Sequence, residues 1–159
     1  MTRLRGRCFR GKRLVAKVPH GHWKTTTLIA ALDKSGIRCS TVVDGAINAD
    51  IFSAFVQQVL LVSLKAGDIV VMDNLSSHKC HRIRELIASV GASVLYLPAY
   101  SPDFNPIEMA FSKLKQLMRS AAHRSKEALW NGMQPLLDQI TSSDAAAFFR
   151  HCGYAIQEK

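Results

Sequence analysis

The order of apolar patterns along the chain is the feature that most constrains its fold. Residues 25–32 and 38–43 are short apolar runs joined by the turn sequence Asp33 to Gly36, which predicts a hairpin. Helix-like and strand-like spacings then alternate over residues 47–60, 69–72, 77–90, 93–97 and 106–118. Two strands followed by alternating helices and strands predict an α/β domain with a mixed sheet.

Local signals at the helix ends agree with this order. Asn48 is placed to cap the first helix, and Ser77 is placed to cap the second, which Gly91 ends. Asn105 followed by Pro106 marks the start of the third helix. The helix boundaries therefore follow from capping residues as well as from apolar spacing.

The length of 159 residues suits one domain with a sizeable core. A weak strand pattern covers residues 13–18, and residues 125–151 predict two short helices that break near residue 142. With 48% hydrophobic and 21% charged residues, the composition excludes a disordered chain, and no apolar run is long enough to cross a membrane. The absence of a signal-peptide pattern and four scattered cysteines predict reduced thiols rather than a zinc or redox motif.

Positive charge is concentrated at one end of the chain. The net charge is +9, and residues 1–24 contain eight Lys and Arg side chains and no acid. A basic block of this kind favours a polyanionic partner, first nucleic acid and second an acidic membrane surface. A solvated basic tail is the alternative.

Two carboxylates stand out because of where the predicted elements place them. Asp73 ends the apolar strand, where it either caps its own loop with Asn74 or is paired or bound to a cation. Glu108 lies in the first turn of the third helix, where a capping box with Asn105 is the stronger interpretation when it is taken alone. Neighbouring strands permit both carboxylates to meet at one sheet edge, where Mg²⁺ or Mn²⁺ would relieve their repulsion.

Other polar residues leave two interpretations open. His78 either orients a water or a phosphate, or it is an ordinary surface histidine. Lys113 and Lys115 lie off the apolar stripe of the third helix, as a solvated face or as a track for phosphates. No phosphate-loop, dinucleotide or G-x-S-x-G motif is present in the sequence, which weakens NTPase, dehydrogenase and hydrolase interpretations.

A longer and more specific pattern includes both carboxylates. The sequence GDIVVMDN followed by His78, together with LPAYSPDFNPIE over residues 97–108, resembles the DDE transposases of bacterial insertion sequences related to mariner elements. As in that family, 34 residues lie between Asp73 and Glu108. The stretches PHGHWKTTTLIAAL and DGAIN also resemble the family, so the resemblance covers essentially the whole chain.

The resemblance implies an RNase H-like fold, with a mixed sheet flanked by helices, and cleavage and joining of DNA phosphodiesters. It makes Asp73 the second and Glu108 the third of three carboxylates that hold two Mg²⁺ or Mn²⁺ ions, with Asn74 and His78 orienting the site. It also implies transposon-end and target DNA as partners, and a homodimer or full-length transposase as a protein partner. The residues assigned to DNA contact are Arg3, Arg5, Arg7, Arg10, Lys12, Arg13, Lys24, Lys113 and Lys115.

The family's first carboxylate has no counterpart in this chain. No acid precedes Asp33, and neither Asp33 nor Asp44 stands in register with that position. The resemblance therefore implies the C-terminal portion of a catalytic domain, with residues 1–24 as a basic segment and residues 25–159 as a truncated domain. We expect it to lack its first strand and a helix-turn-helix, and to be inactive alone.

Two other functions stay open. The main rival is a non-catalytic DNA-binding or regulatory remnant of a transposase, which would use residues 1–24 to contact phosphates. An unrelated RNase H-like nuclease is weaker, because the stretch YSPDFNPIE is specific. For the leading interpretation we expect a cytoplasmic, nucleoid-associated bacterial protein with no membrane partner.

Overall fold

The computed structural model describes residues 6–15, 25–75, 78, 80–123 and 125–155. Its strands are β1 (Thr26–Asp33), β2 (Gly36–Asp44), β3 (Ile69–Met72) and β4 (Ser93–Tyr96). Its helices are α1 (Ala49–Phe55), the π-helical segment η1 (Val56–Leu60), α2 (Leu61–Ser63), α3 (His81–Ser89), the 3₁₀ turn η3 (Pro102–Phe104), α4 (Pro106–Ala121), α5 (Lys126–Leu137) and α6 (Ser142–His151). None of the helices in these ranges combines the length and the apolar character that a membrane crossing requires.

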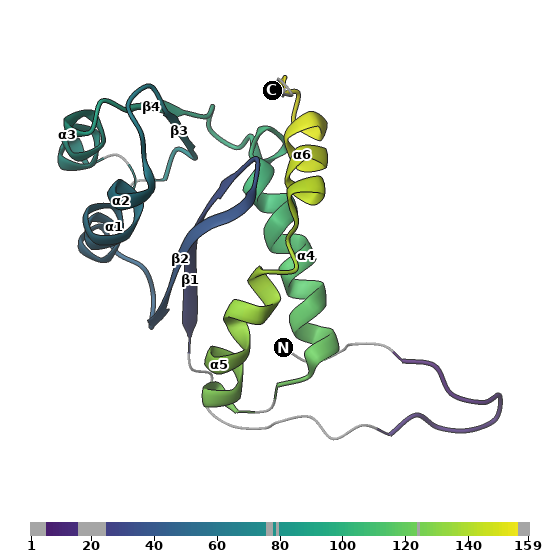
Figure 1. Ribbon diagram of the computed structural model, residues 1–159. Coiled ribbons are helices and arrows are strands. Elements are labelled where there is room, and N and C mark those ends of the chain that lie inside the picture. The colour runs from purple at the N-terminus through teal and green to yellow at the C-terminus, as the bar shows by residue number, and fades with distance from the viewer. Residues whose placement is uncertain (1–5, 16–24, 76–77, 79, 124, 156–159) are drawn as a thin grey trace.

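The antiparallel hairpin of β1 and β2 forms the middle of the molecule, between α1–α3 on one side and α4–α6 on the other (Figure 1). The first core gathers the hairpin, α1, η1, β3 and α3, and the second core gathers the hairpin with α4, α5 and α6. Side chains of the hairpin alternate between the cores: Ile29, Ala31, Cys39 and Val43 pack on the first, and Leu28, Leu32, Ile37 and Val42 on the second. A strand covered on both faces needs apolar side chains throughout, which explains the run Leu28–Leu32.

The second sheet is a βαβ unit. β3 and β4 pair in parallel, from Ile69 opposite Ser93 to Met72 opposite Tyr96, and α3 connects them. The predicted strand over residues 69–72 is therefore confirmed, although its first residue, Ile69, is 64% exposed.

The single mixed sheet predicted from the sequence is not formed by the described residues. β1–β2 and β3–β4 are two separate sheets, so each of these strands keeps one edge without a strand partner among the described residues. The predicted strand over 13–18 is wrong for residues 13–15, which are irregular, and residues 16–18 lie outside the described residues. Val15 is 81% exposed, so its side chain buries little apolar surface and supplies little hydrophobic free energy to hold this segment in a sheet.

The helix boundaries follow their capping residues in most places. Asn48 caps α1 through its side-chain oxygen, which accepts a hydrogen bond from the Ile51 amide at 2.8 Å. Gly91 follows α3 with a φ of 75°, as predicted for the end of that helix. Cys80 occupies the cap position of α3, and the predicted cap, Ser77, lies outside the described residues.

Gly36 joins the hairpin to the second core, and replacing it with Ala is expected to destabilise the domain by about 2 kcal/mol or more. Its φ is 124°, and an added Cβ would lie 2.6 Å from the Ile140 carbonyl oxygen. Gly45 is the matched control, because its φ is 120° but an added Cβ would meet nothing within 4 Å. Urea unfolding of both Ala variants separates the cost of the positive φ, which both positions share, from the cost of the contact with Ile140. Equal destabilisation by both would show that the contact with Ile140 is unimportant.

Candidate metal and DNA site

A cavity of about 450 Å³ lies where the two parallel strands end. Its lining comes from Asp73–Leu75 after β3, from Leu97–Pro102 after β4, and from Asn105 and Glu108 at the start of α4. Because β3 and β4 are parallel, both strands deliver their following loops to the same edge of the sheet. The two carboxylates selected from the sequence, Asp73 and Glu108, therefore line one cavity.

Asp73 is held by its own loop and by a histidine. Its Oδ1 lies 2.5 Å from Nδ1 of His78, in a contact too poorly aligned for a regular hydrogen bond. The same oxygen accepts a long hydrogen bond, 3.4 Å, from the Leu75 amide. The side chain is still 41% exposed, so the carboxylate both organises its loop and remains open to the cavity.

His78 is partly buried rather than an ordinary surface histidine. Its side chain is 15% exposed, and its ring packs on Phe52 of α1 with 4.1 Å between the ring centroids. Its carbonyl oxygen accepts a hydrogen bond of 2.7 Å from the hydroxyl of Tyr96, the last residue of β4. Neither contact could be predicted from the sequence, because both join segments that are distant along the chain.

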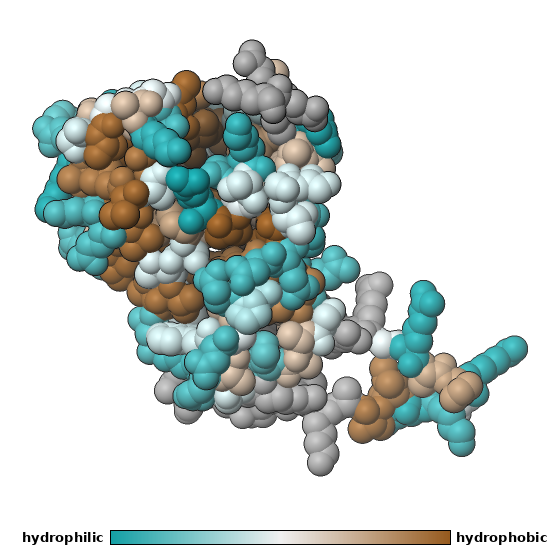
Figure 2. Space-filling view, in the orientation of Figure 1, coloured by the Kyte–Doolittle hydropathy of each residue, from teal (hydrophilic) through white to brown (hydrophobic). Residues whose placement is uncertain are grey.

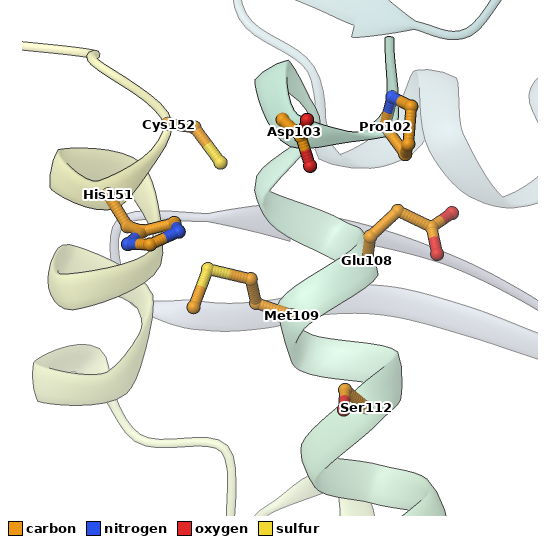
Figure 3. Close-up of a pocket in the computed structure, with 7 residues that line it drawn as sticks. All are labelled: Pro102, Asp103, Glu108, Met109, Ser112, His151 and Cys152. Atoms are coloured by element: carbon orange, nitrogen blue, oxygen red, sulfur yellow. The ribbon is translucent and has the colours of Figure 1, made fainter. Parts of the chain in front are cut away.

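Glu108 does not form the capping box that was the stronger interpretation of the residue taken alone. Asn105 stands at the cap position of α4, but its side chain makes no capping hydrogen bond. Only the backbone is paired there: the Glu108 amide donates to the Asn105 carbonyl at 3.1 Å. Figure 3 shows the Glu108 side chain directed away from α6, whereas Met109 points toward it. The carboxylate is exposed and forms no hydrogen bond among the described residues, so it is free for a ligand.

A second, smaller cavity of about 190 Å³ lies between α4 and the end of α6 (Figure 3). Cys152 lines it, and the pKa of this thiol is raised by burial and by the nearby Asp103 carboxylate. Close by, the Tyr154 hydroxyl donates a hydrogen bond of 2.9 Å to the Phe104 carbonyl. The segment that follows α6 thus braces η3, the turn that precedes Glu108. Nothing in the sequence indicated this contact.

Among the described residues, the basic side chains assigned to DNA do not line the larger cavity. Lys113 forms an ion pair of 2.5 Å with Asp144 of α6. The pKa of Asp144 is lowered to about 2, mainly because the Lys113 ammonium donates a hydrogen bond to its carboxylate. Lys115 is exposed on the same helix. Their contact with DNA stays a prediction, and Lys113 has a structural partner that the sequence did not reveal.

The N-terminal basic residues form a separate surface as far as they are described. The loop of residues 6–15 projects away from the helices and sheets, on the opposite side of the molecule from β3 and β4 (Figures 1 and 2). Its basic side chains are all exposed: Arg7, Arg10, Lys12 and Arg13. The other predicted contacts, Arg3, Arg5 and Lys24, lie outside the described residues.

The donor set fits part of a divalent metal site. Asp73 and Glu108 offer carboxylate oxygens to one cavity, and hard cations such as Mg²⁺ and Mn²⁺ prefer oxygen ligands. A third protein ligand is not found among the described residues, which contain no group of three His, Cys, Asp or Glu that could hold a metal ion.

Comparison with solved structures shows the fold. The Mos1 strand transfer complex matches with a TM-score of 0.67 and 21% identity, over 95% of this chain and 46% of that chain. The Mos1 paired-end complex with the left transposon end matches with a TM-score of 0.67 and 18% identity, over 95% and 46%. The catalytic domain of Mos1 mariner transposase matches with a TM-score of 0.60 and 20% identity, over 80% and 67%.

The protein is therefore a mixed α/β chain with small sheets, similar to the RNase H-like catalytic domain of Mos1 transposase. It spans about half the length of the Mos1 chains in the two DNA complexes. No curated protein sequence matches it significantly. A family model described as DDE superfamily endonuclease matches residues 1–130, which is most of the chain. The chain belongs to the DDE superfamily of endonucleases.

Proposed function

We propose that this chain is the C-terminal portion of the catalytic domain of a DDE transposase from a bacterial insertion sequence. The proposal rests on one observation: Asp73 and Glu108, which have 34 residues between them, line the same cavity with accessible carboxylates. Structures of Mos1 with transposon-end DNA, with Mg and with Mn support DNA as the substrate and a divalent metal as the cofactor.

In this proposal, Asp73 and Glu108 are two of three carboxylates that hold two Mg²⁺ or Mn²⁺ ions. Bound metal would activate water or a 3′-hydroxyl and stabilise the leaving oxygen of a phosphodiester. His78 orients the Asp73 carboxylate, since its Nδ1 lies against Oδ1. Asn74 lines the cavity and can hydrogen-bond a phosphate or a water with its side-chain amide.

We further propose that residues 1–24 contact DNA phosphates and that residues 25–159 are the RNase H-like part. The protein acts on DNA in the bacterial cytoplasm at the nucleoid, as a homodimer or together with full-length transposase.

A non-catalytic DNA-binding or regulatory remnant is the second candidate. Two observations favour it: the described residues supply no third metal ligand, and their strands form two separate sheets. Both candidates bind DNA, but only the first requires metal at Asp73 and Glu108. In either case we propose that the 159-residue chain by itself has little or no nicking activity.

Both candidates predict salt-dependent binding to duplex DNA through the N-terminal basic residues. Replacing the four basic side chains of the loop 6–15 with Gln is expected to reduce the slope of log affinity against log salt by about 3 to 4. Fluorescence anisotropy across a salt series measures this slope. The Lys34→Gln and Lys65→Gln double variant is the control, because both exposed lysines lie outside this loop. An unchanged slope in the fourfold variant would remove the basis for assigning this loop to DNA.

A further inference from the structure

Tyr100 has a completely exposed ring at the edge of the larger cavity. Its relative exposure is 103%, and it lines the cavity together with Asp73 and Glu108. The hydroxyls of Tyr96 and Tyr154 donate hydrogen bonds to backbone carbonyls, but the Tyr100 hydroxyl forms no hydrogen bond among the described residues. The ring and the hydroxyl of Tyr100 are therefore both available to a ligand.

The backbone of Tyr100 has an uncommon conformation. Its φ is 57°, in the left-handed region that an L-residue with a large side chain rarely adopts. Ala122 is the other described non-glycine residue with a positive φ, and it terminates α4, where such a conformation is common. No helix ends at Tyr100, and Pro98 and Pro102 restrict the loop on both sides of it. Gly or Asn would adopt this φ with less steric strain. The protein therefore has an aromatic ring at a position where a smaller residue would give a lower conformational energy.

We propose that Tyr100 stacks on a nucleobase next to the phosphate that the Asp73–Glu108 site serves. This inference rests on the proposed function, because it takes DNA as the ligand of the cavity. A flat ring at the rim of a phosphate site is suited to a base, and stacking tolerates any sequence because every base has a π-face. Among the described residues that line this cavity, Tyr100 is the one aromatic side chain.

The neighbouring aromatic residue provides the matched control. Phe104 is 52% exposed in η3, four residues further along the same loop, but it does not line the cavity. Replacing Phe104 removes a similar exposed ring without touching the rim. A protein partner or a second copy of this chain would bury the Tyr100 ring against side chains and leave DNA bases unaffected, which separates these ligands from a base.

The test uses the full chain and a DNA duplex with a single-stranded 3′ overhang, in Mg²⁺ buffer. The fluorescent base 2-aminopurine is placed at successive positions through the junction and the overhang. Aromatic stacking quenches this base, and anisotropy of a dye on the same DNA reports binding independently. The variants are Tyr100→Phe, Tyr100→Asn, Tyr100→Ala and Phe104→Ala. Tyr100→Asn suits the positive φ, so it is expected to keep the fold even if Tyr100→Ala does not.

We expect quenching at one position with the unmodified chain, Tyr100→Phe and Phe104→Ala, and no quenching with Tyr100→Asn. The affinity of the Tyr100→Asn variant for this DNA is expected to be about fivefold to a hundredfold lower than that of the unmodified chain. If the chain binds DNA and the quenching is the same in Tyr100→Asn, or is absent throughout, the inference is overturned while the proposed function stands. If no variant binds DNA in a salt-dependent way, the proposed function itself fails, and the inference fails with it.

Discussion

The isolated 159-residue chain is expected to bind Mn²⁺ only weakly, with a dissociation constant of about 10⁻³ M, and to nick supercoiled DNA at the background rate. Two carboxylates on one cavity can retain a hard cation, but the described residues offer no third ligand. Asp73→Asn or Glu108→Gln is expected to weaken the remaining Mn²⁺ binding at least about tenfold, since each removes half of the charged ligands. Electron paramagnetic resonance of free Mn²⁺ measures the binding, and plasmid relaxation measures nicking.

Asp103→Asn is the control for the metal prediction. Asp103 is exposed and lies five residues before Glu108, but it lines the smaller cavity rather than the larger one. Its replacement is therefore expected to leave Mn²⁺ affinity unchanged. Unchanged affinity in both Asp73→Asn and Glu108→Gln would show that the metal binds elsewhere. Metal-dependent nicking that both of these variants abolish would show that the chain already contains a complete site, and our expectation of inactivity would then be wrong.

Local apolar spacing predicted most elements of this fold. The hairpin needed only two apolar runs and a turn, and α4 needed an apolar stripe behind Pro106. These features depend on residues close together in the sequence. Helices cover both faces of the hairpin, but among its apolar side chains only Ile29 is buried.

The arrangement of the sheets was harder to predict. A mixed sheet requires backbone pairing between strands that are distant in the sequence, and the described residues supply no strand between the β1–β2 and β3–β4 pairs. The exposure of Ile69 follows from the same fact, since a strand in a two-stranded sheet has a free edge and fewer neighbours.

The candidate site was predictable in its carboxylates but not in their surroundings. The position of Asp73 at a strand end and of Glu108 in the YSPDFNPIE stretch is visible in the sequence. Glu108 has no capping role because the Asn105 amide, which a capping box would use, already donates to the Pro102 carbonyl at 2.9 Å. That His78 packs on Phe52 depends on tertiary packing between segments separated by η1, α2 and β3.

The contact between Phe52 and His78 links the first core to the candidate site. Phe52→Ala is expected to destabilise the domain by about 3–5 kcal/mol, because the ring is 7% exposed in the first core. A loss of this size is a large fraction of the usual 5–15 kcal/mol of a domain, so urea unfolding detects it readily. The His78 imidazole should move as well, since the 4.1 Å contact holds it beside Asp73.

Phe55 separates these two effects. It is 5% exposed in the same core and on the same helix, but its ring lies tilted beside Phe52, with 6.3 Å between the ring centroids, rather than on His78. Phe55→Ala is therefore expected to cost a similar free energy of unfolding while leaving the imidazole resonance of His78 almost unchanged in NMR spectra of the folded protein. If the Ala variants do not fold, Phe52→Leu and Phe55→Leu keep most of the volume and remove only the rings. Equal shifts of the His78 resonance in the two variants would show that the core as a whole, and not the Phe52 ring, positions the histidine beside the Asp73 carboxylate.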